Sequence, residues 1–195
     1  IQFIPEYGVA KGIWYSIFHA VSAFCNAGID ILGDSSLTAY VTNPIVNLTT
    51  MILIILSGLG FTVWFDIIAN GKKLIRREMP RRWWFTRLKL QSKLAIIMTI
   101  LLIISGAVFV FLAEYDNPET LGNLSLGNKV MASFFQSVTN RTAGFATISQ
   151  NALHTESKLF HCILMFIGGS PGGTAGGVKT TTIAMLFLAC LTFVR

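Results

Sequence analysis

Two long stretches without a charged residue limit what this chain can fold into. Residues 45–65 and 94–112 run for 21 and 19 residues without Asp, Glu, Lys or Arg. A helix needs about 20 mainly apolar residues to cross the hydrocarbon core of a bilayer. Only 12% of the chain is charged, about half the usual fraction of a soluble domain. The sequence therefore predicts an all-α integral membrane protein. Because it begins at Ile1 without a signal pattern, we interpret it as an internal fragment.

A strongly basic segment between the two apolar runs predicts their orientation. Residues 71–93 contain nine Lys or Arg and one Glu, a net charge of 9 − 1 = +8. Short loops rich in Lys and Arg stay in the cytoplasm, so we expect a cytoplasmic linker and a multi-pass protein of a bacterial-type plasma membrane. Trp83 and Trp84 are expected to anchor this linker at the inner leaflet lipids. Its position between two spans argues against a nucleic-acid partner.

Two shorter apolar segments predict re-entrant loops. Residues 130–140 are uncharged for only 11 residues and lead into a turn at Gly144. An earlier apolar segment leads in the same way into a turn at Gly28. Segments of this length are too short to cross a bilayer, and irregular backbone at membrane depth must be buried in protein or border water.

The two predicted loops indicate an internal repeat. They align with a shift of 116 residues, which pairs Phe18 with Phe134, Ala27 with Ala143 and Gly28 with Gly144. Each loop is followed after about 30 residues by glycines inside an apolar run. We therefore expect residues 1–70 to supply one loop and inner helix, 71–93 the linker, and 94–195 a complete helix–pore loop–helix repeat. Repeats of this kind are common in transporters, which bind their cargo at the repeat interface.

The loop sequences suggest binding of a cation by backbone carbonyls. Potassium channels strip water from the ion with the carbonyls of a Thr-Val-Gly-Tyr-Gly loop, and residues 142–146 (Thr-Ala-Gly-Phe-Ala) match it in part. The first loop shares only the glycine, and ordinary turns are the alternative interpretation of both. The candidate filter residues are Asn26, Ala27, Gly28, Ile29, Thr142, Ala143, Gly144 and Phe145.

The last apolar run is interrupted by glycines. Residues 159–194 contain six glycines, one proline and a single charge, Lys179. In a continuous helix the glycines and the proline would cost about 6 and 3 kcal/mol relative to alanine, so the helix is expected to break. The freed backbone groups need water or protein partners, which places the break beside an aqueous path. Lys179 would cost about 3 kcal/mol or more at that depth, so it either helps to hold a cation barrier or pairs with another segment.

The outward-facing segments are predicted to be net negative, which favours a cation. The sum of four basic and seven acidic residues is 4 − 7 = −3, from Lys11, Lys129, Arg141, Lys158, Glu6, Asp30, Asp34, Glu114, Asp116, Glu119 and Glu156. Arg141 opposes a cation path unless its head group is paired, so we expect it to form a structural ion pair.

Three motifs together resemble the Trk/Ktr/HKT potassium transporter superfamily, and most closely the bacterial Ktr-type membrane subunit. These are Asn-Ala-Gly at 26–28, Arg-Thr-Ala-Gly-Phe at 141–145 and the glycine-rich segment at 170–182. The resemblance implies four helix–pore loop–helix repeats around one pore, of which this chain holds part of the second and all of the third. It also implies an intramembrane gate, here formed by Gly168, Gly169, Ser170, Pro171, Gly172, Gly173, Thr174, Ala175, Gly176, Gly177 and Lys179.

The same resemblance implies an ion, a cofactor requirement and partners. It implies K⁺ as the transported ion, no bound cofactor, a homodimer and a cytosolic nucleotide-binding ring as regulator. A secondary carrier with a broken-helix site, with Na⁺ as a candidate coupling ion, is the alternative. An NTPase is a remote one, because Val178 separates Gly177 from Lys179 and no acidic residue follows Glu156. The chain is therefore not expected to be an enzyme, and its three Cys and three His have no metal-ligand spacing.

Overall fold

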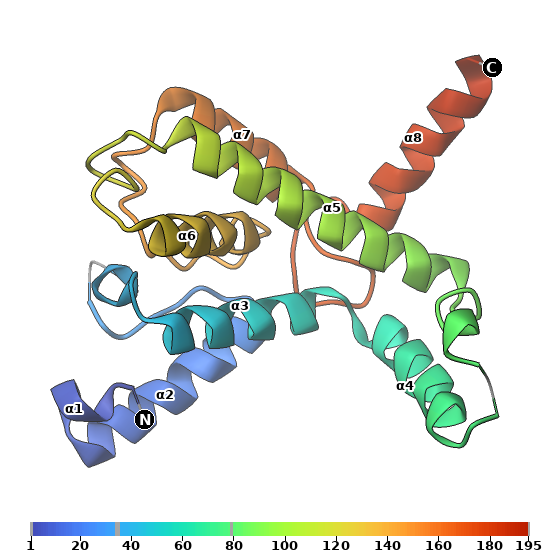
Figure 1. The fold of residues 1–195 in the computed structure, drawn as a ribbon, viewed down its shortest axis with the longest axis horizontal. Coiled ribbons are helices and arrows are strands. Elements are labelled where there is room, and N and C mark those ends of the chain that lie inside the picture. The colour runs from blue at the N-terminus through green and yellow to red at the C-terminus, as the bar shows by residue number, and fades with distance from the viewer. Residues whose placement is uncertain (1, 34–35, 79, 195) are drawn as a thin grey trace.

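The computed structural model describes residues 2–33, 36–78 and 80–194, in which helices are joined by loops (Figure 1). Its one β-type pairing is a parallel bridge between Ile167 and Val178. Asp34, part of the outer charge sum, lies outside the described residues. The α-helices are α1 (Ile4–Tyr7), α2 (Val9–Phe24), α3 (Pro44–Gly58), α4 (Phe61–Ile75), α5 (Leu90–Ala113), α6 (Leu126–Thr139), α7 (Thr155–Phe166) and α8 (Thr180–Val194), with 3₁₀ turns η1 (Thr38–Tyr40) and η2 (Arg81–Trp83).

Helix α5 contains the predicted span 94–112. Within the described residues it is the one helix long and apolar enough to cross a membrane by itself. Ile97, Leu101 and Ile104 are each about half exposed along it, as expected for a surface that faces lipid tails. On the opposite side Ala95, Ala107 and Val110 are buried against the rest of the chain.

The predicted span over residues 45–65, with its interrupting glycines, is divided into two helices. Helix α3 ends at Gly58, α4 begins at Phe61, and the two axes are bent by 95°. Gly60 has a φ of 85°, which suits glycine better than any other residue. The break leaves the last carbonyls of α3 and the first amides of α4 without helical partners, and a distant segment binds there.

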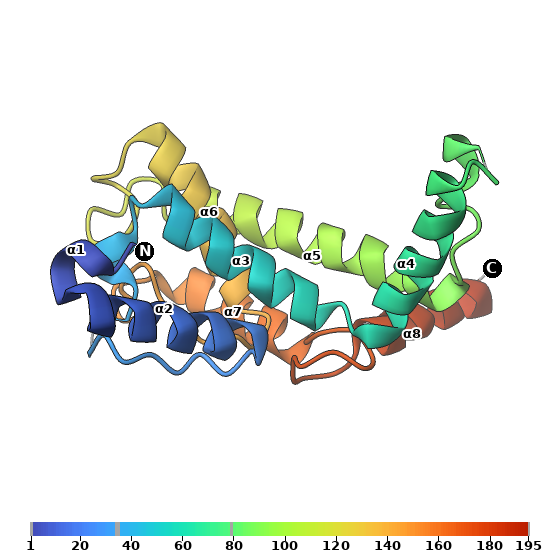
Figure 2. The ribbon, with the colours of Figure 1, turned by 90° about the horizontal axis from the view of Figure 1, so that it is seen from below.

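Helix α6 lies between α5 and α3, and α2 packs along α3 (Figures 1 and 2). The contact of α5 with α6 is close because Gly106 has no side chain. A Cβ atom at this position would overlap Ser137 Oγ and lie 3.0 Å from Leu164 Cδ1. The Ser137 hydroxyl also donates to the Ile103 carbonyl at 2.8 Å. Small residues let membrane helices approach in this way.

Candidate functional site

The two loops predicted to form the filter lie against each other. A Cβ atom on Gly28 would overlap the Ala143 carbonyl oxygen and lie 2.7 Å from Gly144 Cα. The Asn26 amide Nδ2 donates to Thr142 Oγ1 at 3.0 Å. The loop after α2 and the loop after α6, 116 residues apart in sequence, therefore form one site.

The backbone conformation repeats between the loops. Asn26 and Gly28 have φ values of 55° and 65°, and the matching Thr142 and Gly144 have 72° and 98°. Ala27 and Ala143 between them have negative φ. Alternation of positive and negative φ can turn successive carbonyls toward the same side, as a carbonyl-lined ion path requires.

The positive φ of Thr142 marks a strained position. A β-branched residue rarely adopts this region, and such a residue costs about 1–3 kcal/mol. Strain of this size persists only where the surroundings hold the backbone in place. At Thr142 the side-chain hydroxyl accepts two hydrogen bonds, from Asn26 Nδ2 and from the Gly176 amide at 2.9 Å.

A hydroxyl at the end of each short helix holds the residue that follows the loop glycine. Ser22 Oγ donates to the Ile29 carbonyl at 2.6 Å, and Thr139 Oγ1 donates to the Phe145 carbonyl at 2.7 Å. Sequence reasoning missed both hydroxyls, because Ser22 and Thr139 are one position out of register under the 116-residue shift. The carbonyls of Ile29 and Phe145 are thus bound within the protein.

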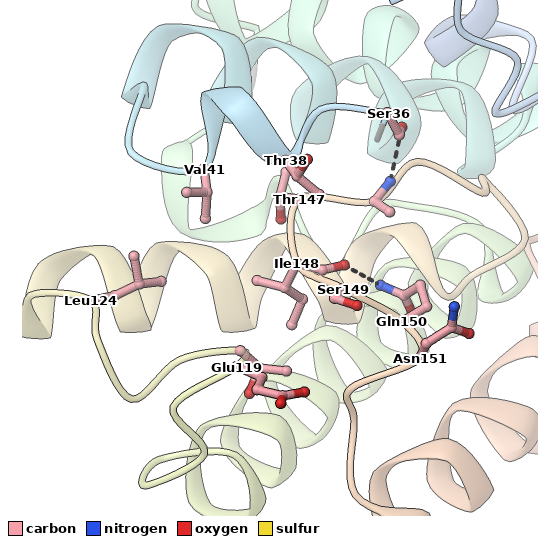
Figure 3. Close-up of a pocket in the computed structure, with 12 residues that line it drawn as sticks. Ser36, Thr38, Val41, Glu119, Leu124, Thr147, Ile148, Ser149, Gln150 and Asn151 are labelled. Carbon is pink, nitrogen blue, oxygen red and sulfur yellow. Dashed lines mark hydrogen bonds between the residues drawn. The ribbon is translucent and has the colours of Figure 1, made fainter. Parts of the chain in front are cut away.

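Two cavities border the paired loops. One, of about 600 Å³, is lined by loop residues including Ala27 and Gly144 and by α7 residues including His161 and Met165. The second, of about 550 Å³, is lined mainly by hydroxyl and amide side chains and by Glu119 (Figure 3). Ala146 and Gln150 line both cavities, so the two cavities adjoin each other beside the loops.

Glu114, counted as an exposed outer charge, is instead buried. Its carboxylate accepts hydrogen bonds from Asn117 Nδ2 at 2.6 Å, Thr120 Oγ1 at 2.9 Å and the His154 amide at 2.9 Å. Burial acts to raise the pKa of Glu114, but these donors, together with the Ser157 hydroxyl, outweigh burial and lower it. Glu114 therefore ties the end of α5 to the start of α7 and does not act as a free charge.

Lys129, another member of the outer charge sum, is buried as well. Its Nζ donates to the Tyr115 carbonyl at 2.8 Å and lies 4.0 Å from the centroid of the Tyr115 ring. The carboxylate that borders the cavity of about 550 Å³ is Glu119.

The glycine-rich segment forms a loop, residues 167–179, between α7 and α8, as the helix-breaking residues predicted. The loop fills the break between α3 and α4. The amides of Ser170 and Thr174 donate to the Gly58 and Ser57 carbonyls at 2.9 and 3.3 Å, and the Phe61 amide donates to the Gly172 carbonyl at 3.2 Å.

Glycine is required where the loop backbone crosses other backbone. A Cβ atom on Gly173 would lie 2.7 Å from the Gly58 carbonyl oxygen, and one on Gly168 would overlap the Gly176 carbonyl oxygen. Ser170 is fully buried and its hydroxyl lies 3.0 Å from that of Thr180. Lys179 Nζ donates to the Ala175 carbonyl at 2.8 Å, so the lysine braces the loop from within.

The same loop also reaches the paired filter loops. The Gly176 amide donates to Thr142, and Thr174 Oγ1 donates to the Phe24 carbonyl at 3.3 Å. The predicted ion pair of Arg141 is not observed, since no carboxylate among the described residues lies within pairing distance. Arg141 is buried, and its Nη2 donates to Thr99 Oγ1 at 3.4 Å and to the Gly168 carbonyl at 3.5 Å.

Similarity to one protein family extends over nearly the whole chain. The sequence model of the family described as TrkH, cation transport protein, matches residues 2–195. The chain belongs to the TrkH cation transport protein family. The family expected from the three motifs is thereby confirmed.

Two bacterial relatives indicate how much of a TrkH-family protein this chain represents. It is 38% identical over 195 residues to the Ktr system potassium uptake protein B of Bacillus subtilis, covering 100% of this chain and 41% of the relative. It is 43% identical over 188 residues to the potassium/sodium uptake protein NtpJ of Enterococcus hirae, covering 96% of this chain and 39% of the relative. The chain thus spans about two fifths of the length of these relatives.

A solved structure supports the TrkH fold. The potassium transporter TrkH from Vibrio parahaemolyticus matches 99% of this chain and 45% of its own with a TM-score of 0.68. The sequence identity is 20%, so this likeness concerns the fold alone.

Proposed function

We propose that this chain supplies two of the pore loops of a membrane protein that takes up potassium. The observation that carries the proposal is the direct contact of two loops with the same alternation of positive φ. The names of two relatives, a potassium uptake protein and a potassium/sodium uptake protein, support K⁺ as the ion. In this proposal the chain is a transport subunit and catalyses no reaction.

The proposed mechanism is replacement of the hydration shell. A K⁺ ion entering from the cavity of about 550 Å³, which is the outer cavity in this proposal, exchanges water for the carbonyl oxygens of residues 26–28 and 142–144. Glu119 at the outer cavity raises the local cation concentration. Ile29 and Phe145 have their carbonyls bound by Ser22 and Thr139, so they act as anchors of the two loops.

The glycine-rich loop is the proposed gate. Its bonds to the α3–α4 break and to Thr142 place it beside the filter loops. Its Lys179 adds a positive charge, which repels a cation from the closed path.

Replacement of Gly144 by Ser in the full-length protein tests the filter. Gly144 has a φ of 98°, which a side chain rarely adopts, so the carbonyls of its loop should shift. We expect a lower ratio of K⁺ to Na⁺ uptake in cells or vesicles. Gly127→Ser is the matched control, because a Cβ atom there meets no neighbouring atom within 4 Å. Unchanged ion ratios in Gly144→Ser would reject the filter assignment.

A sodium-coupled carrier is the second candidate, and the potassium/sodium uptake protein NtpJ is the observation that favours it. A carrier predicts saturable uptake of K⁺ that depends on a sodium gradient. A pore predicts flux that follows the membrane potential without sodium. Uptake by vesicles with and without a sodium gradient separates the two.

The partners are proposed from the resemblance. They are a second copy of the full-length protein, each with its own pore, and a cytosolic nucleotide-binding ring. The basic linker 71–93 provides +8 of charge toward the cytoplasm, for the ring or for anionic lipid. Hydrolysis of ATP by the purified subunit alone would contradict the absence of an enzymatic role.

A further inference from the structure

We propose that the Thr142 hydroxyl is a latch that holds the glycine-rich loop against the filter, so that opening of the gate alters the filter itself. The proposal rests on the function proposed above, which makes residues 142–144 a filter and residues 168–179 a gate. One oxygen atom joins three segments here. It accepts from Asn26 Nδ2 in the first loop and from the Gly176 amide in the gate, and it belongs to the second loop.

The latch position is fixed from several directions. Asn26 Nδ2 also donates to the Arg141 carbonyl at 3.3 Å, and Arg141 Nη2 reaches the Gly168 carbonyl at the other end of the gate loop. Both Asn26 and Arg141 are buried, with exposed fractions of 8% and 5%. The strained φ of 72° at Thr142 therefore occurs where buried Asn26 and Arg141 are themselves held by hydrogen bonds.

The gate side of the latch leaves room for movement. A Cβ atom on Gly176 would lie 3.8 Å from Thr142 Oγ1, in ordinary contact, whereas most other glycines of the loop would overlap backbone. The Gly176 amide thus approaches the threonine through one hydrogen bond and without interlocked side chains. Loss of this bond removes the contact of residue 176 with the filter, leaves its carbonyl bound only within the gate loop by the Gly169 amide at 3.3 Å, and removes one of the two donors that fix the threonine hydroxyl.

The consequence concerns ion selection. In the closed state both acceptor positions of the Thr142 oxygen are occupied by N–H groups, so the oxygen is unavailable to a cation. When the gate loop leaves, one of these positions becomes free to face the ion. Thr142 therefore positions the gate in the closed state and becomes a cation ligand in the open state.

Thr142→Val in the full-length protein is the primary test. Valine keeps the β-branched shape and loses the oxygen, so the gate-loop amides should exchange hydrogen about fivefold faster, as expected for loss of one hydrogen bond. Hydrogen exchange of peptides covering residues 168–179 measures this without any transport. Potassium flux at fixed membrane potential should rise in the same variant, and its K⁺ to Na⁺ ratio should fall.

Three further variants make the test specific. Thr142→Ser keeps the hydroxyl and should retain wild-type exchange and flux. Thr142→Gly relieves the backbone strain without restoring the hydroxyl, so it should exchange as fast as Thr142→Val even if valine disturbs folding. Thr147→Val is the matched control, since this buried threonine hydroxyl has no hydrogen-bond partner within the described part of the chain.

The outcomes separate the latch from the function on which it rests. Wild-type exchange in Thr142→Val, or equally fast exchange in Thr142→Ser or Thr147→Val, would overturn the latch and leave the filter proposal intact. Absence of K⁺ uptake by the full-length wild-type protein would overturn the function, whereas the exchange result would still report whether the hydroxyl holds the loop.

Discussion

At the scale of single residues, the structure assigns structural roles to buried polar groups that the sequence could only count as charges. Glu114 illustrates this. Its carboxylate is fully buried at the end of α5 and accepts hydrogen bonds from the following turn and from the residue that precedes α7. Hydrogen bonds to a charged group contribute about 1.5–3 kcal/mol each, so this residue should matter for the outer loop.

Glu114→Gln should lower the free energy of unfolding by about 2 kcal/mol at pH 7, because the amide offers one acceptor where the carboxylate offers two. The folded-state pKa of Glu114 is lowered, so its stabilisation is present above the unfolded-state pKa and is lost as pH falls through the folded-state value. The difference between wild type and Glu114→Gln should therefore shrink in acid. Thermal unfolding in detergent between pH 7 and pH 3 measures it, and a difference independent of pH would contradict this role.

At the scale of elements, the helices follow from the sequence while their breaks and contacts depend on distant segments. The apolar run 94–112 predicted α5, and the short runs predicted α2 and α6. The 95° bend of α3–α4 was not predicted as such, because Gly58 and Gly60 alone do not reveal that residues 170–174 bind in the gap. Packing at Gly106 depends in the same way on Ser137 and Leu164, which lie far along the chain.

Gly106→Ala should destabilise the contact of α5 with α6 and α7 by about 1–3 kcal/mol, since the added methyl group overlaps Ser137. Gly71→Ala in α4 is the matched control, because a Cβ atom there meets no neighbouring atom within 4 Å. That control should be neutral or stabilise by about 0.5–1 kcal/mol, as expected for alanine in a helix interior. Thermal unfolding of both variants in detergent measures this, and equal stabilities would contradict close packing at Gly106.

At the scale of the whole molecule, the family and the all-α fold were predictable from three motifs and the apolar runs. The pairing of Asn26 with Thr142 was not, although the 116-residue repeat placed both in matching loops. The repeat predicts that the two loops have the same conformation. Whether Asn26 contacts Thr142 depends on how the two halves of the chain pack. The predicted ion pair of Arg141 is not observed among the described residues, where its partners Thr99 and Gly168 come from two other elements.

The gate proposal makes a prediction at this scale. Deletion of residues 172–177 in the full-length protein should raise potassium flux, because it removes the contacts with Phe61 and Thr142 together. Flux assays in vesicles measure this. Gly127→Ser, which should transport like the wild type, controls for effects of expression and reconstitution. Flux equal to that of the wild type would count against gating by this loop.

The wedge of glycine-rich backbone in the α3–α4 break has a consequence for biogenesis. Residues 57–61 and 170–174 satisfy each other's peptide groups, yet a ribosome makes them more than a hundred residues apart. Until residues 170–174 have been synthesised, the peptide groups at the α3–α4 break must bind water or a chaperone. The hydrogen bonds at the α3–α4 break therefore form late, after insertion of α5. A nascent protein halted before residue 170 would lack them.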